Sequence, residues 1–320
     1  MKDNTFPAAI WHEKENLDGK VVRVFVVVLR TRGCFWAKKS GCLMCGYNSE
    51  SSDDITDAQI IAQVENALSS YQNEEFVKIY TSGSFFDTAE ISTETQEKIL
   101  ERFGERCQRV LVETRPEFAE RALQLMHHCQ ELEVALGMET ASQTVLDKCV
   151  RKGTTVQQYL NAAEKLRSAG IRVRIYLLLK PPFLTEAEAI EDTLRSIQVA
   201  AKYADVISVN PVNVQKGTFL EKMFLRDEYR APWFWSIFEV LKKARETIRI
   251  PVISHPSGSG KKRGIHNCGK CDEHCNNLLK KYNLTQEPDV LSYTCECKSV
   301  WEAQKNMENV LRYSPYLAME

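Results

Sequence analysis

The sequence predicts an α/β fold with a parallel sheet, and two observations support this prediction. Between residues 21 and 214, short β-branched apolar runs alternate with longer amphipathic segments, which is the pattern of strand–helix units. The apolar runs are nearly continuous, as in strands whose sheet is covered on both faces. Six units are fewer than the eight of a closed TIM barrel. We therefore expect an open sheet or a partial (β/α)6 TIM-type barrel, with its chemistry at the carboxyl ends of the strands.

The elements follow one another in a regular order. The predicted strands span residues 21–29, 76–80, 109–112, 133–136, 173–179 and 204–209. Helical patterns lie between them at residues 57–71, 92–103, 116–129, 143–148 with 156–169, and 186–202. Thr56 and Ser92 are predicted helix N-caps, and Pro116 suits a first helical turn.

The pattern changes near residue 229. A helix start at residues 232–235 leads to a short strand at 248–254, a basic loop at 255–264 and a closing helix after Trp301. We therefore expect two domains, which are a core over residues 1–228 and a small C-terminal extension over residues 229–320.

Composition limits the class of protein. The chain has 320 residues, of which 43% are hydrophobic and 27% charged, with a formal net charge of -1. This balance suits a folded protein and excludes binding of nucleic acid through overall basicity, although a local basic patch stays possible. No apolar run approaches the ~20 residues of a membrane span. We expect a cytoplasmic protein that does not contact a membrane.

The 11 cysteines are the unusual feature of the composition. Three lie in residues 34–45 and five in residues 268–297. The odd total and the absence of an export signal argue against a disulfide framework, and clustered thiols in a reducing compartment more often hold metal. The scattered Cys107, Cys129 and Cys149 are predicted to be small buried apolar residues.

The first group of cysteines follows the first predicted strand. Cys34, Cys42 and Cys45 form a C-x7-C-x2-C loop. Three thiolates can hold a 4Fe-4S cluster and leave its fourth iron without a protein ligand, where a small molecule can bind. The alternative is a structural zinc ion, which would need a fourth ligand from a distant residue.

This loop and the strand ends after it resemble the radical S-adenosylmethionine (SAM) superfamily, in the branch similar to the elongator catalytic subunit. The usual motif has three residues between its first two cysteines, whereas this chain has seven. Longer first gaps occur in the elongator-like branch. The similar segments, at residues 80–87, 112–117, 136–142 and 151–153, follow one another within residues 21–217.

The resemblance implies two cofactors, a 4Fe-4S cluster on the three cysteines and SAM on its open iron. It implies SAM contacts from Ser82, Gly83, Ser84, Glu113, Glu139 and Arg174. The alternatives are a plain turn glycine at Gly83, a surface ion pair at Glu113 and a snorkelling side chain at Arg174. An electron from the reduced cluster would release methionine and a 5′-deoxyadenosyl radical, which abstracts hydrogen from an unreactive carbon.

The second group of cysteines combines a C-x2-C pair with a C-x-C pair. We favour Cys268, Cys271, Cys295 and Cys297 as the ligands of one tetrahedral zinc ion. Cys275, His266 and His274 are further candidates, and a second iron–sulfur cluster is the competing metal site. The C-terminal extension is therefore predicted to be a metal-binding segment.

A basic run precedes these cysteines. Lys261, Lys262 and Arg263 lie in a glycine-rich loop that suits an RNA backbone. The alternative is a solvated charged loop. Trp233, Phe234 and Trp235 can stack on bases, but we expect them to be buried.

Across the chain, the pattern is most similar to the archaeal radical SAM family of archaeosine biosynthesis. That family implies a lyase that cleaves the C–N bond of a lysine-modified 7-deazaguanine in tRNA to form archaeosine. It also implies an archaeosine synthase partner subunit, which attaches the lysine, and an electron donor. Two alternatives stay open, namely another elongator-like radical SAM enzyme with a different substrate, or a non-catalytic metal-bearing subunit.

Overall fold

The computed structural model describes residues 3–311 of the chain. The chain divides into two compact units. Unit 1 comprises Met1–Gly41, Tyr47–Gly137 and Gln157–Arg174, and unit 2 comprises Cys42–Gly46, Met138–Val156 and Ile175–Glu320. The functional division into residues 1–228 and 229–320 stays a prediction. Residues 1–2 and 312–320 of those domains lie outside the described residues.

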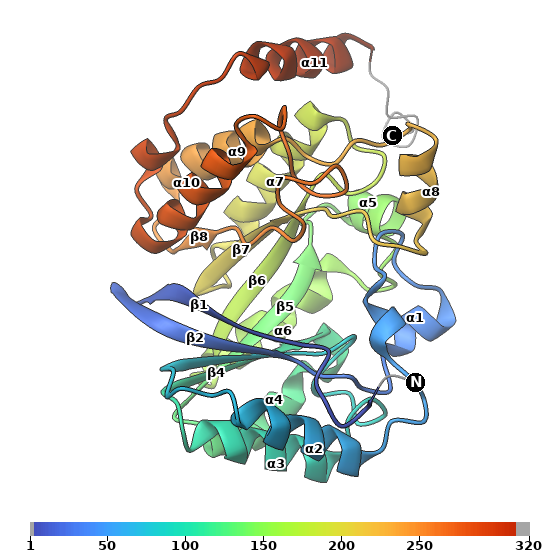
Figure 1. Cartoon of the computed structure of the whole chain (residues 1–320), viewed down its shortest axis with the longest axis vertical. Coiled ribbons are helices and arrows are strands. Elements are labelled where there is room, and N and C mark those ends of the chain that lie inside the picture. Colours follow the sequence, from blue (N-terminus) through green and yellow to red (C-terminus); the bar gives the residue numbers. More distant parts are fainter. Residues whose placement is uncertain (1–2, 312–320) are drawn as a thin grey trace. The chain divides into compact units, whose positions relative to one another are not determined.

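Eight strands form one sheet, in which each strand neighbours the next along the chain (Figure 1). β1 and β2 are antiparallel, while β2 to β5 run parallel, as do β7 and β8. The bounds are β1 Ala9–Leu17, β2 Lys20–Val28, β3 Phe76–Tyr80, β4 Arg109–Thr114, β5 Glu131–Glu139, β6 Arg172–Leu179, β7 Val206–Pro211 and β8 Val252–Ile253. The predicted α/β class with a largely parallel sheet is confirmed.

The sequence prediction missed β1. This strand pairs with β2 from Ala9 opposite Val28 to Leu17 opposite Lys20. The turn between them is Asp18–Gly19, with φ values of +50° and +94°, and an Asp-Gly pair is a strong hairpin signal. Most residues of β1 are exposed or half-buried and polar, so the strand lacks the apolar run on which the prediction relied.

The helices of unit 1 confirm the predicted caps. Thr56 Oγ1 accepts a hydrogen bond from Gln59 N at 3.2 Å, and Ser92 Oγ accepts one from Thr95 N at 3.4 Å. The predicted helix over residues 116–129 is broken into three short pieces. The bounds are α1 Phe35–Lys39, η1 Tyr47–Glu50, α2 Asp57–Leu68, α3 Thr93–Gly104, η2 Pro116–Arg121, α4 Ala122–Leu125, η3 Met126–His128 and α6 Val156–Ser168, which begins at the unit boundary.

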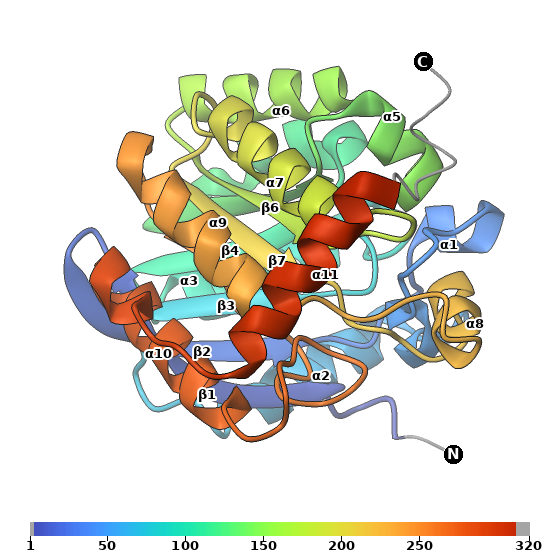
Figure 2. The same cartoon turned by 90° about the horizontal axis from the view of Figure 1, so that it is seen from above.

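The helices of unit 2 include α7, α9 and α11, which lie side by side (Figure 2). The fully buried Glu186 of α7 accepts hydrogen bonds from Trp233 N at 3.0 Å and Ser236 Oγ at 2.6 Å. Trp301 Nε1 donates to the same hydroxyl at 2.8 Å, so the Glu186 carboxylate joins α7 to α9 and the Ser236 hydroxyl adds α11. The bounds are α5 Gln143–Val145, a π-helical turn Leu146–Val150, α7 Glu186–Ala200, α8 Phe219–Leu225, α9 Phe234–Thr247, α10 Asp272–Thr285, η5 Pro288–Leu291 and α11 Cys297–Leu311.

Several burial predictions are also tested. Trp233, Phe234 and Trp235 are buried, as expected. Cys107 and Cys149 are buried too, whereas Cys129 is only partly so. Among the helices of residues 3–311, none is long and apolar enough to cross a membrane.

Candidate functional site

In unit 1, a tight turn after β2 presents the first cysteine. Cys34 is the N-cap of α1 and is half-buried. Its backbone N–H donates to Asn48 Oδ1 at 3.1 Å. Gly33 has a φ of +85°, and a Cβ on it would come within 2.7 Å of Ser51 Cβ, so glycine is required there. The backbone that carries Cys34 is therefore fixed on both sides.

The segment after β3 packs directly against this turn. A Cβ on Gly83 would overlap with Glu90 Oε2 and approach Cys34 Cα to 2.7 Å. The buried Glu90 accepts hydrogen bonds from Ser84 N at 2.6 Å and from Thr31 Oγ1 at 2.5 Å. Burial raises the pKa of Glu90 above its ordinary value, although these hydrogen bonds oppose the shift. Glu90 thereby joins the Gly83–Ser84 backbone to the end of β2.

The ends of β3 and β4 are joined as well. Arg115 N donates to Ser84 Oγ at 3.1 Å, and Phe85 N donates to the Glu113 carbonyl oxygen at 2.8 Å. The predicted SAM residues Ser84 and Glu113 therefore lie on neighbouring, hydrogen-bonded segments. Ser82 lies beside them and donates through Oγ to the Tyr47 carbonyl oxygen at 3.2 Å.

In unit 2, the segment Cys42–Gly46 is held by its backbone. Leu43 N donates to the Val150 carbonyl oxygen at 3.1 Å, and the Leu43 carbonyl oxygen accepts from Leu220 N at 3.0 Å. Met44 is buried in an apolar group with Leu146, Val150, Val212, Val214, Leu220, Met223, Tyr229 and Ala231. Cys42 is half-buried and Cys45 exposed. Leu43 and Met44 anchor the segment, Cys42 packs against the apolar group from its edge, and Cys45 lies at the surface.

Glu139, also in unit 2, occupies the last position of β5. Its φ is +70°, which is uncommon for a residue other than glycine. Its carboxylate forms an ion pair with Lys152, and both side chains are mostly buried. The predicted SAM contact Glu139 therefore stands at a strained strand end, where such conformations often accompany function.

Arg174 lies elsewhere in unit 1. Its Nε donates to Glu133 Oε1 at 2.6 Å, and its guanidinium also pairs with Glu15. All three side chains are buried. In the pairing of β4 with β5, Glu133 lies opposite Leu111, which is two residues before Glu113. The structure thus places Arg174 in an ion network below the strand ends and does not bring it together with Ser84 and Glu113. Its contact with SAM stays a prediction.

The four cysteines that the sequence favours in the C-terminal extension do come together in unit 2. The Sγ atoms of Cys268, Cys271, Cys295 and Cys297, here called the four-cysteine cluster, all lie within 4.8 Å of one another. Cys268 Sγ is 3.7 Å from Cys271 Sγ and 4.0 Å from Cys295 Sγ, and Cys271 Sγ is 3.7 Å from Cys297 Sγ. A tetrahedral ion with metal–sulfur bonds of about 2.3 Å separates its ligands by about 3.8 Å. The arrangement fits a single metal ion.

Hydrogen bonds support these thiols. Burial raises the pKa of Cys268, but backbone N–H groups of Cys271 and Lys270 outweigh it and lower the value to about 7. Asn267 Nδ2 donates to Cys271 Sγ at 3.4 Å. N–H donors of this kind favour the thiolate, which is the form that binds metal.

The other candidate ligands lie outside this group. Cys275 is buried, and burial raises the pKa of its thiol. The His274 ring packs against Tyr293 with ring centroids 4.4 Å apart. His266 Nδ1 lies 2.8 Å from the Gly264 carbonyl oxygen. The structure therefore separates the four clustered cysteines from Cys275, His266 and His274.

The basic loop divides into two parts. Lys261 and Lys262 are exposed. Arg263 instead pairs with Glu221 at 2.6 Å, and its guanidinium lies 5.4 Å from the centre of the Phe224 ring. Arg263 therefore holds the loop against α8, while the two lysines face solvent.

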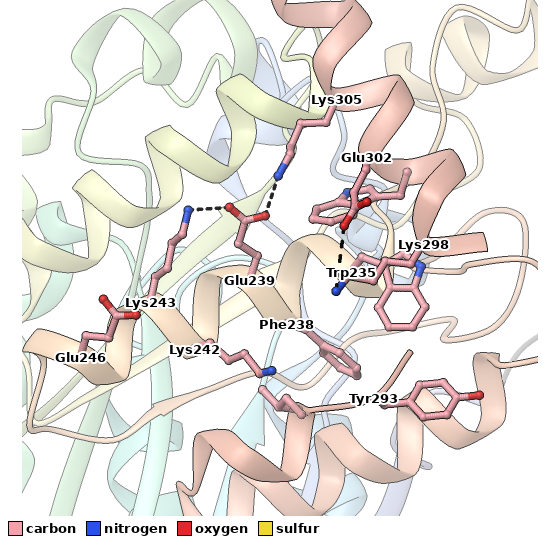
Figure 3. A pocket seen from close by; sticks show the side chains of 12 residues that line it. Trp235, Phe238, Glu239, Lys242, Lys243, Glu246, Tyr293, Lys298, Glu302 and Lys305 are labelled. Carbon is pink, nitrogen blue, oxygen red and sulfur yellow. Dashed lines mark hydrogen bonds and ion pairs between the residues drawn. The ribbon is translucent and has the colours of Figure 1, made fainter. Parts of the chain in front are cut away.

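A cleft of about 370 Å³ lies beside α9 and α11 (Figure 3). Its lining includes the buried Trp235, Phe238 and Trp301. At its rim, Glu239 accepts hydrogen bonds from Lys243 at 2.6 Å and Lys305 at 2.8 Å. The buried rings and the Lys305–Glu239 pair connect α9 and α11.

Sequence reasoning missed the residues that support the site. Glu90 and Asn267 lie in loops and Asn48 lies in the short η1, and no spacing or motif marks these polar residues. Arg115 stands within a segment that the sequence did single out, but its guanidinium packs against Phe35 and Trp36, next to Cys34, only in the folded chain. Only the fold brings these side chains to their partners.

The fold and the cysteine loop define the class of protein. A model of the "Radical SAM superfamily" matches residues 28–197, more than half of the chain. The chain belongs to this superfamily. It is also 38% identical to archaeosine synthase subunit beta of Methanosarcina acetivorans, over 97% of this chain and 93% of that protein. The predicted resemblance is confirmed.

Two solved structures support the fold. A queuine lyase from Clostridium spiroforme, bound to SAM and queuine, aligns with a TM-score of 0.53 at 19% identity, over 78% of this chain and 96% of its own. An N-terminally truncated archaeal Elp3 from Methanocaldococcus infernus gives 0.50 at 19% identity, over 71% of this chain. This chain spans 58% of that Elp3 structure. The predicted partial barrel of radical SAM type, with elongator-like relatives, is confirmed.

Proposed function

We propose that this chain is a radical SAM lyase of tRNA modification that cleaves the C–N bond of a lysine-modified 7-deazaguanine in tRNA to form archaeosine. The observation that carries the proposal is the 38% identity to an archaeosine synthase subunit beta over nearly the full length of both chains. The relative's name, which makes it one subunit of an archaeosine synthase, also supports a partner subunit. We propose that this partner is an archaeosine synthase and that the substrate is tRNA, as the family resemblance implies. A reduced electron donor is a further requirement of this chemistry.

We propose that Cys34, Cys42 and Cys45 hold the 4Fe-4S cluster that the superfamily implies. The donor set fits, because three thiols stand in one loop after the first parallel strand. When bound, the cluster and SAM supply a carbon-centred radical that removes hydrogen from an unactivated C–H bond. The chain's own residues position the candidate SAM contacts, because Glu90 and the hydrogen-bonded ends of β3 and β4 hold Ser84 and Glu113 in place.

We propose SAM contacts at Ser82, Gly83, Ser84, Glu113, Glu139 and Arg174. Gly83 and Ser84 offer backbone groups near Cys34, which suits the amino group of a ligand there. Glu139 offers carboxylate oxygens to ribose hydroxyls. The ion pair with Lys152 holds that carboxylate in one orientation.

We propose zinc as the metal of the four-cysteine cluster, because four thiolates at tetrahedral separations form a closed ligand set. We also propose that the loop of Lys261, Lys262 and Arg263 binds the tRNA backbone. The two exposed lysines would neutralise phosphates, whereas Arg263 would hold the loop against α8 through its ion pair with Glu221.

The decisive experiment is a tRNA modification assay under anaerobic conditions. The reconstituted full chain, the partner subunit, SAM and a reductant are incubated with lysine-modified tRNA, and nucleosides are analysed by mass spectrometry. We expect loss of the lysine adduct and appearance of archaeosine. A matched variant with serine at positions 34, 42 and 45 should form none. Turnover of SAM without conversion of the base would reject the lyase and favour another radical SAM substrate.

A further inference from the structure

A buried arginine lies against the turn that carries Cys34. Arg115 is 4% exposed. Its guanidinium carbon lies 5.1 Å from the centre of the Phe35 ring and 5.8 Å from that of Trp36. These two aromatic residues begin α1, whose N-cap is Cys34. The guanidinium is therefore packed against the first turn of the helix that presents the first cysteine.

The position of this guanidinium is fixed from two directions. Phe35 is held by an edge-to-face contact with Phe118, with ring centroids 5.6 Å apart. The Arg115 backbone N–H is bound by Ser84 Oγ at 3.1 Å. Glu117 accepts a hydrogen bond from the guanidinium at 2.7 Å and is 28% exposed. A rigid cation with one partly solvated carboxylate thus stands next to the turn.

The charge of Arg115 lies beside the helix start whose N-cap is Cys34. Burial alone lowers the pKa of the guanidinium, but Glu117, Tyr159 and Cys34 raise it above its ordinary value. Arginine stays protonated in proteins, so its charge is permanent. In a buried setting this charge is screened far less than one at the surface.

We propose that Arg115 raises the reduction potential of the iron–sulfur centre bound through Cys34, and that Glu117 moderates this effect. This inference rests on the proposed function. Reduction adds one electron to a centre that already carries the negative charge of its thiolates. A nearby fixed cation therefore stabilises the reduced form more than the oxidised form, and net charge is one of the factors that set such potentials. The Glu117 carboxylate acts in the opposite direction.

The test measures the midpoint potential by EPR-monitored redox titration of the reconstituted full chain without SAM. Arg115→Met removes the cation and should lower the potential, by about tenfold in the equilibrium constant for reduction, or 59 mV for one electron. Arg115→Lys keeps the charge and should recover most of the wild-type value. Glu117→Gln should raise the potential. Lys39→Met is the matched control, because it removes an exposed cation 6.0 Å from the Trp36 ring and should leave the potential unchanged.

The opposite signs expected for the two partners distinguish charge from packing. Unchanged potentials in Arg115→Met and Glu117→Gln, with normal iron content, would overturn the inference. Shifts of both variants in the same direction would overturn it too, because they would indicate a packing effect. If Arg115→Met does not take up iron, Arg115→Lys and Glu117→Gln still decide the question. Absence of any cluster signal in the wild-type chain would instead reject the proposed function.

Discussion

The two cysteine-bearing regions of this chain prepare their thiols in different ways. In the four-cysteine cluster, three Sγ pairs already lie 3.7 to 4.0 Å apart and all four atoms lie within 4.8 Å of one another, which suits one tetrahedral ion. In the N-terminal loop, the structure fixes the backbone around the thiols instead. Gly33 and Asn48 hold Cys34, while Met44 and backbone hydrogen bonds hold the segment with Cys42 and Cys45.

This difference separates two uses of metal. Four thiolates complete the coordination of a tetrahedral ion and leave no position for a substrate, which is typical of structural sites. Three thiolates leave one iron of a 4Fe-4S cluster without a protein ligand, which is what a cofactor-binding site requires. We therefore expect loss of the metal at the four-cysteine cluster to affect stability. Loss of the cluster at the N-terminal loop should affect chemistry.

The largest effect is expected from replacing Cys34, Cys42 and Cys45 together by serine. Iron should fall from about four per chain to near zero, since no thiolate remains to hold it. SAM cleavage should fall to background, measured as formation of 5′-deoxyadenosine. The thermal midpoint should change little, because none of these thiols belongs to the buried core. Retention of iron and SAM cleavage would contradict the assignment of this loop.

The reverse result is expected for Cys271→Ser. Zinc should be lost, and the thermal midpoint should fall by several degrees, because metal binding to a closed thiolate site contributes directly to folding. Iron at the N-terminal loop should stay near four per chain. Metal analysis and differential scanning calorimetry measure both outcomes. The control is Cys275→Ser, which alters a buried thiol outside the cluster and should keep its zinc.

A smaller effect on stability, with a clear effect on binding, is expected for Gly83→Ala. The added Cβ would meet Glu90 Oε2 and come within 2.7 Å of Cys34 Cα, and overpacking of this kind costs about 1–3 kcal/mol. SAM affinity should fall at least tenfold, measured by equilibrium dialysis of the reconstituted chain. Gly170→Ala is the control, since its φ of +81° strains alanine while no atom lies within 4 Å. That variant should lose stability and keep SAM affinity.

Sequence patterns predicted what depends on neighbours along the chain. The run at Phe76–Tyr80 has the predicted bounds, because its apolar residues are continuous. The caps Thr56 and Ser92 bond to amides three residues away, so their signal is local. The C-x2-C and C-x-C pairs identified the four-cysteine cluster because each pair is a short local unit.

Contacts between distant segments could not be read in this way. Arg174 is bound by Glu15, which lies 159 residues earlier, and no local pattern reveals that pair. Glu90 gains its role only when the turn before α3 meets Ser84 and Thr31. β1 was missed because its pairing with β2, and not an apolar run, makes it a strand. The residues that support the site are therefore brought there by contacts between distant segments, whereas its cysteines can be recognised from their spacing in the sequence.

The smallest effect is expected from replacing Asp192 in unit 2. It distinguishes a contribution to stability that depends on pH from one that depends on the bound metal. Asp192 is 3% exposed and accepts a hydrogen bond from Thr140 Oγ1 at 3.0 Å, next to Glu139. Burial raises its pKa from 3.8 to about 6, and the Thr140 hydrogen bond opposes the shift. The folded chain therefore binds this proton more tightly than the unfolded chain does, so this carboxyl group's contribution to stability falls as pH rises from about 4 to 6.

Asp192→Asn mimics the protonated carboxyl group and should remove this loss. At pH 7.5 the variant should gain about 1–3 kcal/mol in free energy of unfolding, and the gain should shrink toward pH 4. Urea denaturation across this range measures the difference between variant and wild type. A chelator that lowers the stability of both proteins should leave their difference unchanged, because Asp192 acts through desolvation and not through the four-cysteine cluster. A gain that is independent of pH, or that disappears with the metal, would contradict this account of the strand end that carries Glu139.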